Sequence, residues 1–109
     1  MKIQTKKGVY FRFIDDRFIT LAHIFWEEYQ KEDIIPTITS ADDGKHHPNS
    51  WHYKGLGWDW RVWNLRNPQN VADNIRKKAQ EIDFHYNIIF GDELHKDHIH
   101  SEYNEKKVK

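Results

Sequence analysis

Aromatic and charged side chains alternate along the stretch Trp58-Asp59-Trp60-Arg61-Val62-Trp63. Successive side chains of a β-strand point to opposite faces of a sheet, so this alternation predicts a strand with two unlike faces. Gly55 and Gly57 precede the stretch, and we expect the strand within residues 52–63. Its tryptophans belong either to the core or to a substrate groove, and the core is the commoner place for aromatic residues in a small domain.

Two other segments have apolar residues at the three- and four-residue spacing of an amphipathic helix. The first covers residues 16–30 and follows a candidate N-cap, Asp15, while the second begins at Asn67-Pro68 and continues to Ile82. Shorter segments predict strands at residues 34–39, 84–90 and 97–103. We therefore expect an α+β fold, with two helices packed on a small, mainly antiparallel sheet, in a single domain of residues 1–109.

The composition limits the classes of function that the chain can have. Seventeen basic residues balance 17 acidic ones over 109 residues, so nothing indicates a nucleic-acid partner. The apolar runs are too short to span a membrane and no export signal is visible at the start, so we expect synthesis in the cytoplasm. The absence of cysteine excludes disulfides, thiolate zinc sites and cysteine nucleophiles.

Six of the eight histidines fall in two short segments, residues 46–52 and 95–100. In the first, His52 and Asp59 are seven residues apart with two glycines between them, which allows both side chains to converge on one point. In the second, His98 and His100 are two residues apart and would lie on one face of a strand. Histidine and carboxylate side chains are the ligands of catalytic zinc, which keeps a further position for water. Strand geometry alone leaves open whether both histidines bind metal or one contacts substrate.

The pattern Ser50-x-His52-x-x-Gly55-x-Gly57-x-Asp59, followed by Asp97-His98-x-His100, resembles the zinc D-alanyl-D-alanine carboxypeptidases (peptidase family M15). This group has the hedgehog/DD-peptidase fold, and the resemblance is to its small phage or prophage members over residues 35–103. It implies a zinc metallopeptidase that hydrolyses D-amino-acid-containing peptides of peptidoglycan at the bacterial cell wall, with a zinc-activated water as nucleophile.

The resemblance also implies a role for each matching residue. His52, Asp59 and His100 would hold Zn²⁺, Asp97 would act as general base, and His98 would assist at the substrate carbonyl. Asp97 must then lie where the strand begins or twists, because in an unbroken strand it would face away from His100. Glu93 is a rival for the base. Beside these residues, we expect substrate contacts from His46, Ser50, Trp60 and Arg61.

One departure from the family bears on the bond that is cut. Many members have an arginine before the first ligand that holds a terminal carboxylate, and this chain has none between Arg17 and Arg61. That difference favours cleavage within a peptide over removal of its last residue. The alternative function is a non-catalytic zinc-binding module of the same fold, which would bind a protein or cell-wall partner.

Overall fold

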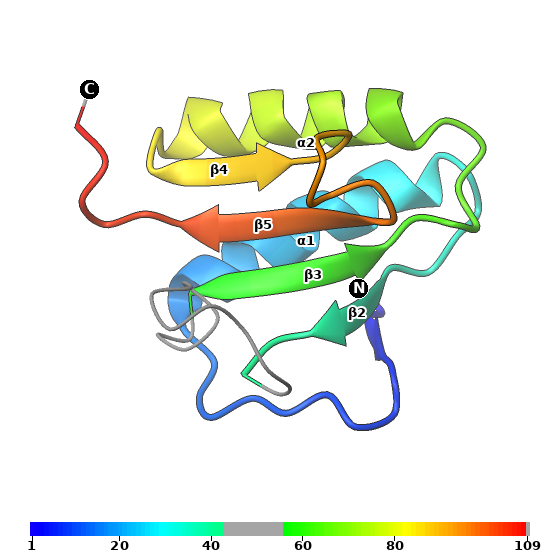
Figure 1. Ribbon diagram of the computed structural model, residues 1–109, viewed down its shortest axis with the longest axis horizontal. Helices are drawn as coiled ribbons and strands as arrows, with labels where there is room; N and C mark the ends of the chain where they lie inside the picture. Colours follow the sequence, from blue (N-terminus) through cyan, green and yellow to red (C-terminus); the bar gives the residue numbers. More distant parts are fainter. Residues whose placement is uncertain (43–55, 109) are drawn as a thin grey trace.

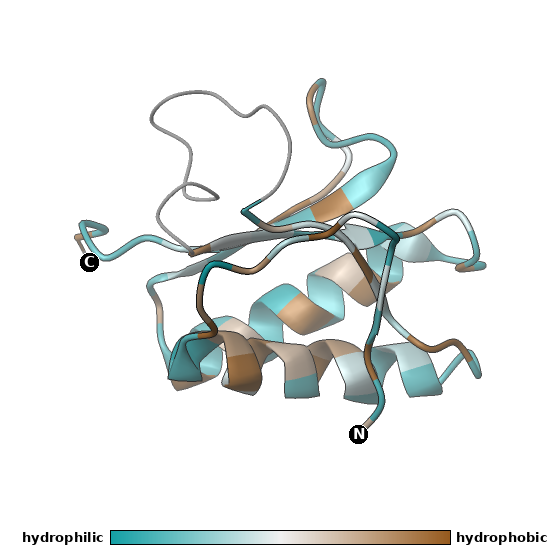
Figure 2. Ribbon diagram, turned by 90° about the horizontal axis from the view of Figure 1, so that it is seen from below, coloured by the Kyte–Doolittle hydropathy of each residue, from teal (hydrophilic) through white to brown (hydrophobic). Residues whose placement is uncertain are grey.

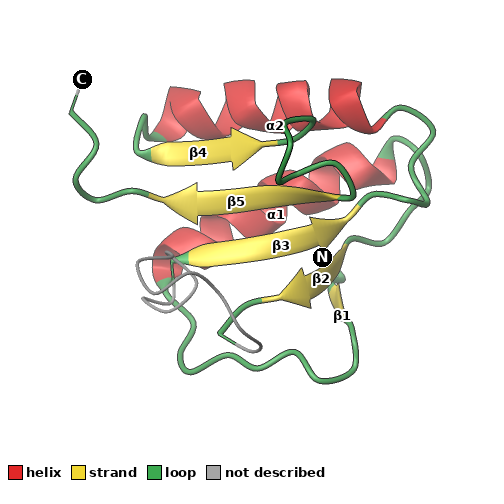
Figure 3. Cartoon of the chain, viewed as in Figure 1, coloured by secondary structure: helices red, strands yellow, loops and turns green. Residues whose placement is uncertain are grey.

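The structure is a computed structural model that describes residues 1–42 and 56–108. In this part of the chain five strands form one sheet in the order β1-β2-β3-β5-β4 (Figures 1 and 3). Four of them are β2 (Thr37–Ser40), β3 (Gly57–Arg61), β4 (Tyr86–Ile89) and β5 (His98–Tyr103), which pair antiparallel. The fifth, β1 (Gln4–Thr5), pairs parallel to β2 at the edge. The α+β class and the mainly antiparallel sheet are therefore confirmed.

Both predicted helices are present, α1 (Asp16–Gln30) and α2 (Pro68–Ile82). The Asp15 carboxylate accepts a hydrogen bond of 2.8 Å from the Arg17 backbone N–H, which caps the first turn of α1. The Asn67 side chain caps α2 in the same way, through the Asn70 backbone N–H. Neither helix has the length and apolar character that a membrane crossing would need in the described part of the chain.

The two helices cover the same face of the sheet, and the core lies between these layers (Figure 2). Trp60 of β3 is fully buried there and stacks on Phe25 of α1, with the ring centroids 3.9 Å apart. Its indole Nε1–H donates a hydrogen bond of 2.9 Å to the Ser101 hydroxyl of β5. Trp58, two residues earlier, is buried on the same side. The alternation of residues 58–61 thus divides the strand as the sequence predicts, with Asp59 and Arg61 on the opposite face.

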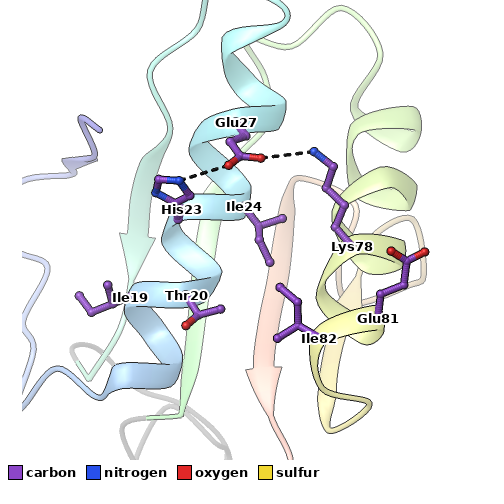
Figure 4. A pocket seen from close by; sticks show the side chains of 8 residues that line it. All are labelled: Ile19, Thr20, His23, Ile24, Glu27, Lys78, Glu81 and Ile82. Atoms are coloured by element: carbon purple, nitrogen blue, oxygen red, sulfur yellow. Dashed lines mark hydrogen bonds and ion pairs between the residues drawn. The ribbon is translucent and has the colours of Figure 1, made fainter.

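A groove of about 590 Å³ runs between α1 and α2 (Figure 4). Its lining comes from the two helices alone, and Glu27 crosses it to pair with His23 of the same helix and with Lys78 of α2. Deeper between the helices, the buried Glu28 carboxylate lies 2.6 Å from the Lys78 ammonium group. These contacts hold the helical layer together. Asp59, His98 and His100, which are among the reactive groups predicted from the sequence, lie on the other face of the sheet.

Candidate functional site

The face of the sheet away from the helices carries the candidate site. β3 and β5 pair so that Asp59 lies opposite His100 and Arg61 lies opposite His98. The side chains of these four residues share that face, because residues two apart on a strand point the same way. Segments about 40 positions apart in the sequence therefore bring together two histidines and a carboxylate at the centre of the sheet, where β3 and β5 are neighbours (Figure 1).

Asp59 and His100 are in direct contact. The Asp59 Oδ1 atom lies 2.9 Å from the His100 Nδ1 atom, and the two side chains are only 14% and 10% exposed. Two ligands on one tetrahedral zinc ion, each bonded at 2.0–2.1 Å, are separated by roughly 3.3 Å. The two donor atoms therefore need to move only slightly to share an ion, so this pair fits zinc in chemistry and in spacing.

His98 lies between two carboxylates. Its Nδ1 atom is 2.7 Å from Asp97 Oδ1, and its Nε2 atom is 3.7 Å from Asp59 Oδ1. β5 begins at His98, so Asp97 precedes the strand. Asp97 therefore need not point away from His100, as it would have to in an unbroken strand. The hydrogen bond from His98 holds the pKa of the Asp97 carboxyl below its usual value. Asp97 is therefore an ionised carboxylate at neutral pH and can accept a proton.

Glu93, the rival for the base, is placed less favourably. Its side chain is 92% exposed and pairs with Lys96 at 3.5 Å. Asp97 instead contacts His98 directly. The contacts therefore favour Asp97.

Three predicted site residues, His46, Ser50 and His52, lie outside the described residues. Within residues 1–42 and 56–108, no three His, Asp or Glu side chains are arranged to hold one metal ion. The Asp59–His100 pair thus supplies two donors, and the third predicted ligand, His52, belongs to the segment that is not described.

The prediction that Trp60 contacts substrate is wrong. Trp60 is fully buried under α1, on the opposite face of the sheet from Asp59 and His100. The strand period puts neighbouring residues on opposite faces, so a strand that presents Asp59 to the site must turn Trp60 into the core.

Arg61 does lie beside the candidate site. It lines a pocket of about 260 Å³ together with five other residues: Lys6, Thr39, Trp63, Asp97 and His98. The Arg61 guanidinium carbon lies 5.0 Å from the centroid of the Trp63 ring, which is a cation–π arrangement. Among the described residues the buried Arg61 Nε atom has no hydrogen-bond partner. Two cationic side chains, Arg61 and Lys6, therefore line a pocket that opens next to the predicted base.

Two neighbours of His100 in the structure were not predicted from the sequence. Glu102 Oε1 lies 2.8 Å from His100 Nε2, and the centroid of the His95 ring lies 5.2 Å from that of His100. Extending the two-residue period from His98 and His100 would have found Glu102. His95 lies between β4 and β5, in a loop where no periodic signal exists.

The pKa of His100 leads to a testable dependence of zinc binding on pH. Burial lowers this pKa, but the hydrogen bonds with Asp59 and Glu102 outweigh burial and raise it from 6.5 to about 9. Without metal, the protonated ring stabilises the fold fully below pH 6.5, and this contribution is lost as the pH rises through 9. Zinc requires a neutral imidazole, so binding must displace this proton.

We therefore expect the apparent zinc affinity to rise about tenfold per pH unit between pH 7.5 and 8.5. A histidine with an ordinary pKa of about 6.5 is already neutral in that range, so it would contribute little to the dependence of zinc affinity on pH. Competition with a chromophoric chelator measures the affinity, and calorimetry in two buffers counts the protons released. An affinity that does not change over this range would contradict the prediction.

Comparisons with protein-family models, with curated proteins and with solved structures find no match to this chain.

Proposed function

We propose that this chain is a zinc-dependent peptidase with a hedgehog/DD-peptidase-like fold, which hydrolyses D-amino-acid-containing peptides of bacterial peptidoglycan. The observation that carries the proposal is the meeting of Asp59 and His100, 41 residues apart, with their donor atoms 2.9 Å from each other. Asp97 and His98 adjoin this pair. Four positions of the two motifs thus lie together on one face, as a peptidase of this type requires.

The metal would be held by Asp59 and His100, with His52 as the third ligand. A bound zinc ion supplies Lewis acidity, which acidifies a water molecule and polarises the scissile carbonyl group. Asp97 accepts the proton of the attacking water and returns it to the leaving amine. Its hydrogen bond with His98 Nδ1 turns the other ring nitrogen, Nε2, toward Asp59. In its doubly protonated form His98 donates from Nε2 to the carbonyl oxygen, where negative charge develops. A donor of this kind contributes roughly 3 kcal/mol to transition-state stabilisation.

The pocket lined by Arg61 and Lys6 is where we place part of the substrate. Stem peptides of peptidoglycan carry free carboxylates, and a guanidinium group binds a carboxylate through paired hydrogen bonds. The pocket adjoins Asp97 and His98, so a carboxylate bound there would lie close to the bond that is cut. Arg61 can thus orient the peptide without taking part in the chemistry.

Replacement of Arg61 by glutamine is expected to raise KM about tenfold and to leave kcat within about twofold. The lost contact stabilises the bound substrate and the transition state equally, so its removal weakens binding without slowing the chemical step. Steady-state kinetics on purified muropeptides measures both constants. Arg66→Gln is the matched control, since the Arg66 side chain is 81% exposed and pairs with Glu32. A fall in kcat at unchanged KM would assign Arg61 to the chemical step instead.

The proposed function is tested by cleavage of purified muropeptides. We expect the zinc-loaded protein to cut them, and both the chelator-treated protein and the His52→Ala and His100→Ala variants to be inactive. His23→Ala is the control, because His23 is an exposed histidine on α1, on the other side of the sheet. Equal cleavage by all these proteins would refute a zinc peptidase. Zinc binding without any cleavage would leave the non-catalytic zinc module as the explanation.

A further inference from the structure

Both ring nitrogens of His100 face carboxylates. Nδ1 lies 2.9 Å from Asp59 on β3, and Nε2 lies 2.8 Å from Glu102, two residues further along β5. All three side chains are at least partly shielded from water, with exposed fractions between 10% and 14%. The ring is thus held from both edges, and the two carboxylates occupy different sides of it.

Glu102 is itself fixed by the neighbouring strand. Its second oxygen, Oε2, accepts a hydrogen bond of 3.0 Å from the Asn87 side-chain amide of β4. The side-chain oxygen of Asn87, Oδ1, in turn accepts a hydrogen bond of 2.9 Å from the Lys107 ammonium group. Opposite Glu102 on β3 stands Gly57, which has no side chain to occupy the space above that strand. A hydrogen-bonded chain therefore links Lys107, which follows β5, through Asn87 of β4 to Glu102 and His100 of β5.

We infer that Glu102 is a positioning residue for the metal centre: it receives the Nε2–H of His100 and thereby assigns Nδ1 to the metal. The inference rests on the proposed function, since it takes Asp59 and His100 as zinc ligands. A histidine ligand binds through one nitrogen, and the hydrogen bond made by the other fixes its tautomer, its orientation and its basicity. Asp59 faces Nδ1, so only Nδ1 can share an ion with Asp59 while the ring keeps its contact with Glu102.

The test compares zinc affinity in Glu102→Gln with that of the unaltered protein, by competition with a chromophoric chelator. Loss of such a partner typically weakens metal binding 10- to 100-fold, and we expect a loss of about this size. Asn87→Ala removes the hydrogen bonds that Asn87 makes with Glu102 and Lys107 but keeps Glu102 itself, so we expect a smaller loss, of a few fold. Glu81→Gln, an exposed residue of α2 in the groove between the helices, makes the same change of charge and should leave the affinity unchanged.

Nitrogen NMR of the zinc-loaded protein gives a readout that a merely structural role would not affect. The expected spectrum has zinc on Nδ1 and a proton on Nε2 of His100, with the Nε2–H signal shifted in Glu102→Gln. Far-UV circular dichroism checks that each variant is folded. Zinc on Nε2, or an affinity of Glu102→Gln within twofold of the unaltered protein, would overturn the inference.

These outcomes separate the two proposals. Zinc on Nδ1 with weakened binding in Glu102→Gln, but no cleavage of muropeptides, would support the role of Glu102 and refute the peptidase. Cleavage by a Glu102→Gln protein of unchanged zinc affinity would refute only the role of Glu102. A protein that binds no zinc would refute both.

Discussion

The Asp97→Asn variant is expected to cleave muropeptides about 100 to 10,000 times more slowly than the unaltered protein and to bind zinc equally well. The substitution removes the group that accepts a proton from the attacking water. It keeps an oxygen that can accept the hydrogen bond from His98 Nδ1, which Asp97 Oδ1 accepts at 2.7 Å. The orientation of His98 should therefore survive, and the loss should fall on kcat.

Stability should hardly change, because the Asp97 side chain is 91% exposed and substitutions of exposed surface residues have small effects on stability. The hydrogen bond from His98 holds the pKa of Asp97 below its usual value, so this carboxylate is ionised at neutral pH. Glu93→Gln is the matched control, at an exposed carboxylate four residues earlier. If Glu93→Gln loses the activity and Asp97→Asn keeps it, the base is Glu93. If Asp97→Asn no longer binds zinc, Asp97 is a zinc ligand and not the general base.

The helices could be predicted from the sequence because their signals are local. Asp15 and Asn67 mark the two starts, and the structure has the helices at Asp16–Gln30 and Pro68–Ile82. β1 was not predicted, because it consists of two exposed residues. Its position depends on β2, through hydrogen bonds such as that from Gln4 N–H to the Pro36 carbonyl. No pattern within residues 1–7 could show a pairing made with a strand 33 positions away.

The site could be predicted only in part. Because side chains two residues apart on a strand point the same way, His98 and His100 were predicted to share one face of the sheet. Their shared contact with Asp59 confirms this prediction. The meeting of Asp59 with His100 depends on the register between β3 and β5, which spacing along the chain does not specify. It was expected from the resemblance to the zinc peptidases. Glu102 could have been found from the strand period, whereas the approach of His95 depends on a loop.

The Trp60→Ala variant is expected to lose about 4 kcal/mol of unfolding free energy, which corresponds to a decrease in Tm of about 15 to 25 °C. Trp60 is fully buried, stacks on Phe25 at 3.9 Å and donates a hydrogen bond to Ser101. Truncation to alanine removes the indole from a packed core and leaves a cavity between β3 and α1. Chemical denaturation followed by circular dichroism measures the loss.

Trp63→Ala is the matched control for Trp60→Ala, since Trp63 is 75% exposed just beyond the end of the same strand. It should cost less than about 0.5 kcal/mol, as surface substitutions usually do. Trp60→Phe keeps a ring against Phe25 but loses the indole N–H, so we expect an intermediate loss of about 1 to 2 kcal/mol. An increase in KM at unchanged stability in Trp60→Phe would indicate that Trp60 contacts substrate, and would contradict its place in the core. The same alternation that turns Asp59 toward His100 turns Trp60 away from the site, so substitutions at these adjacent positions should separate function from stability.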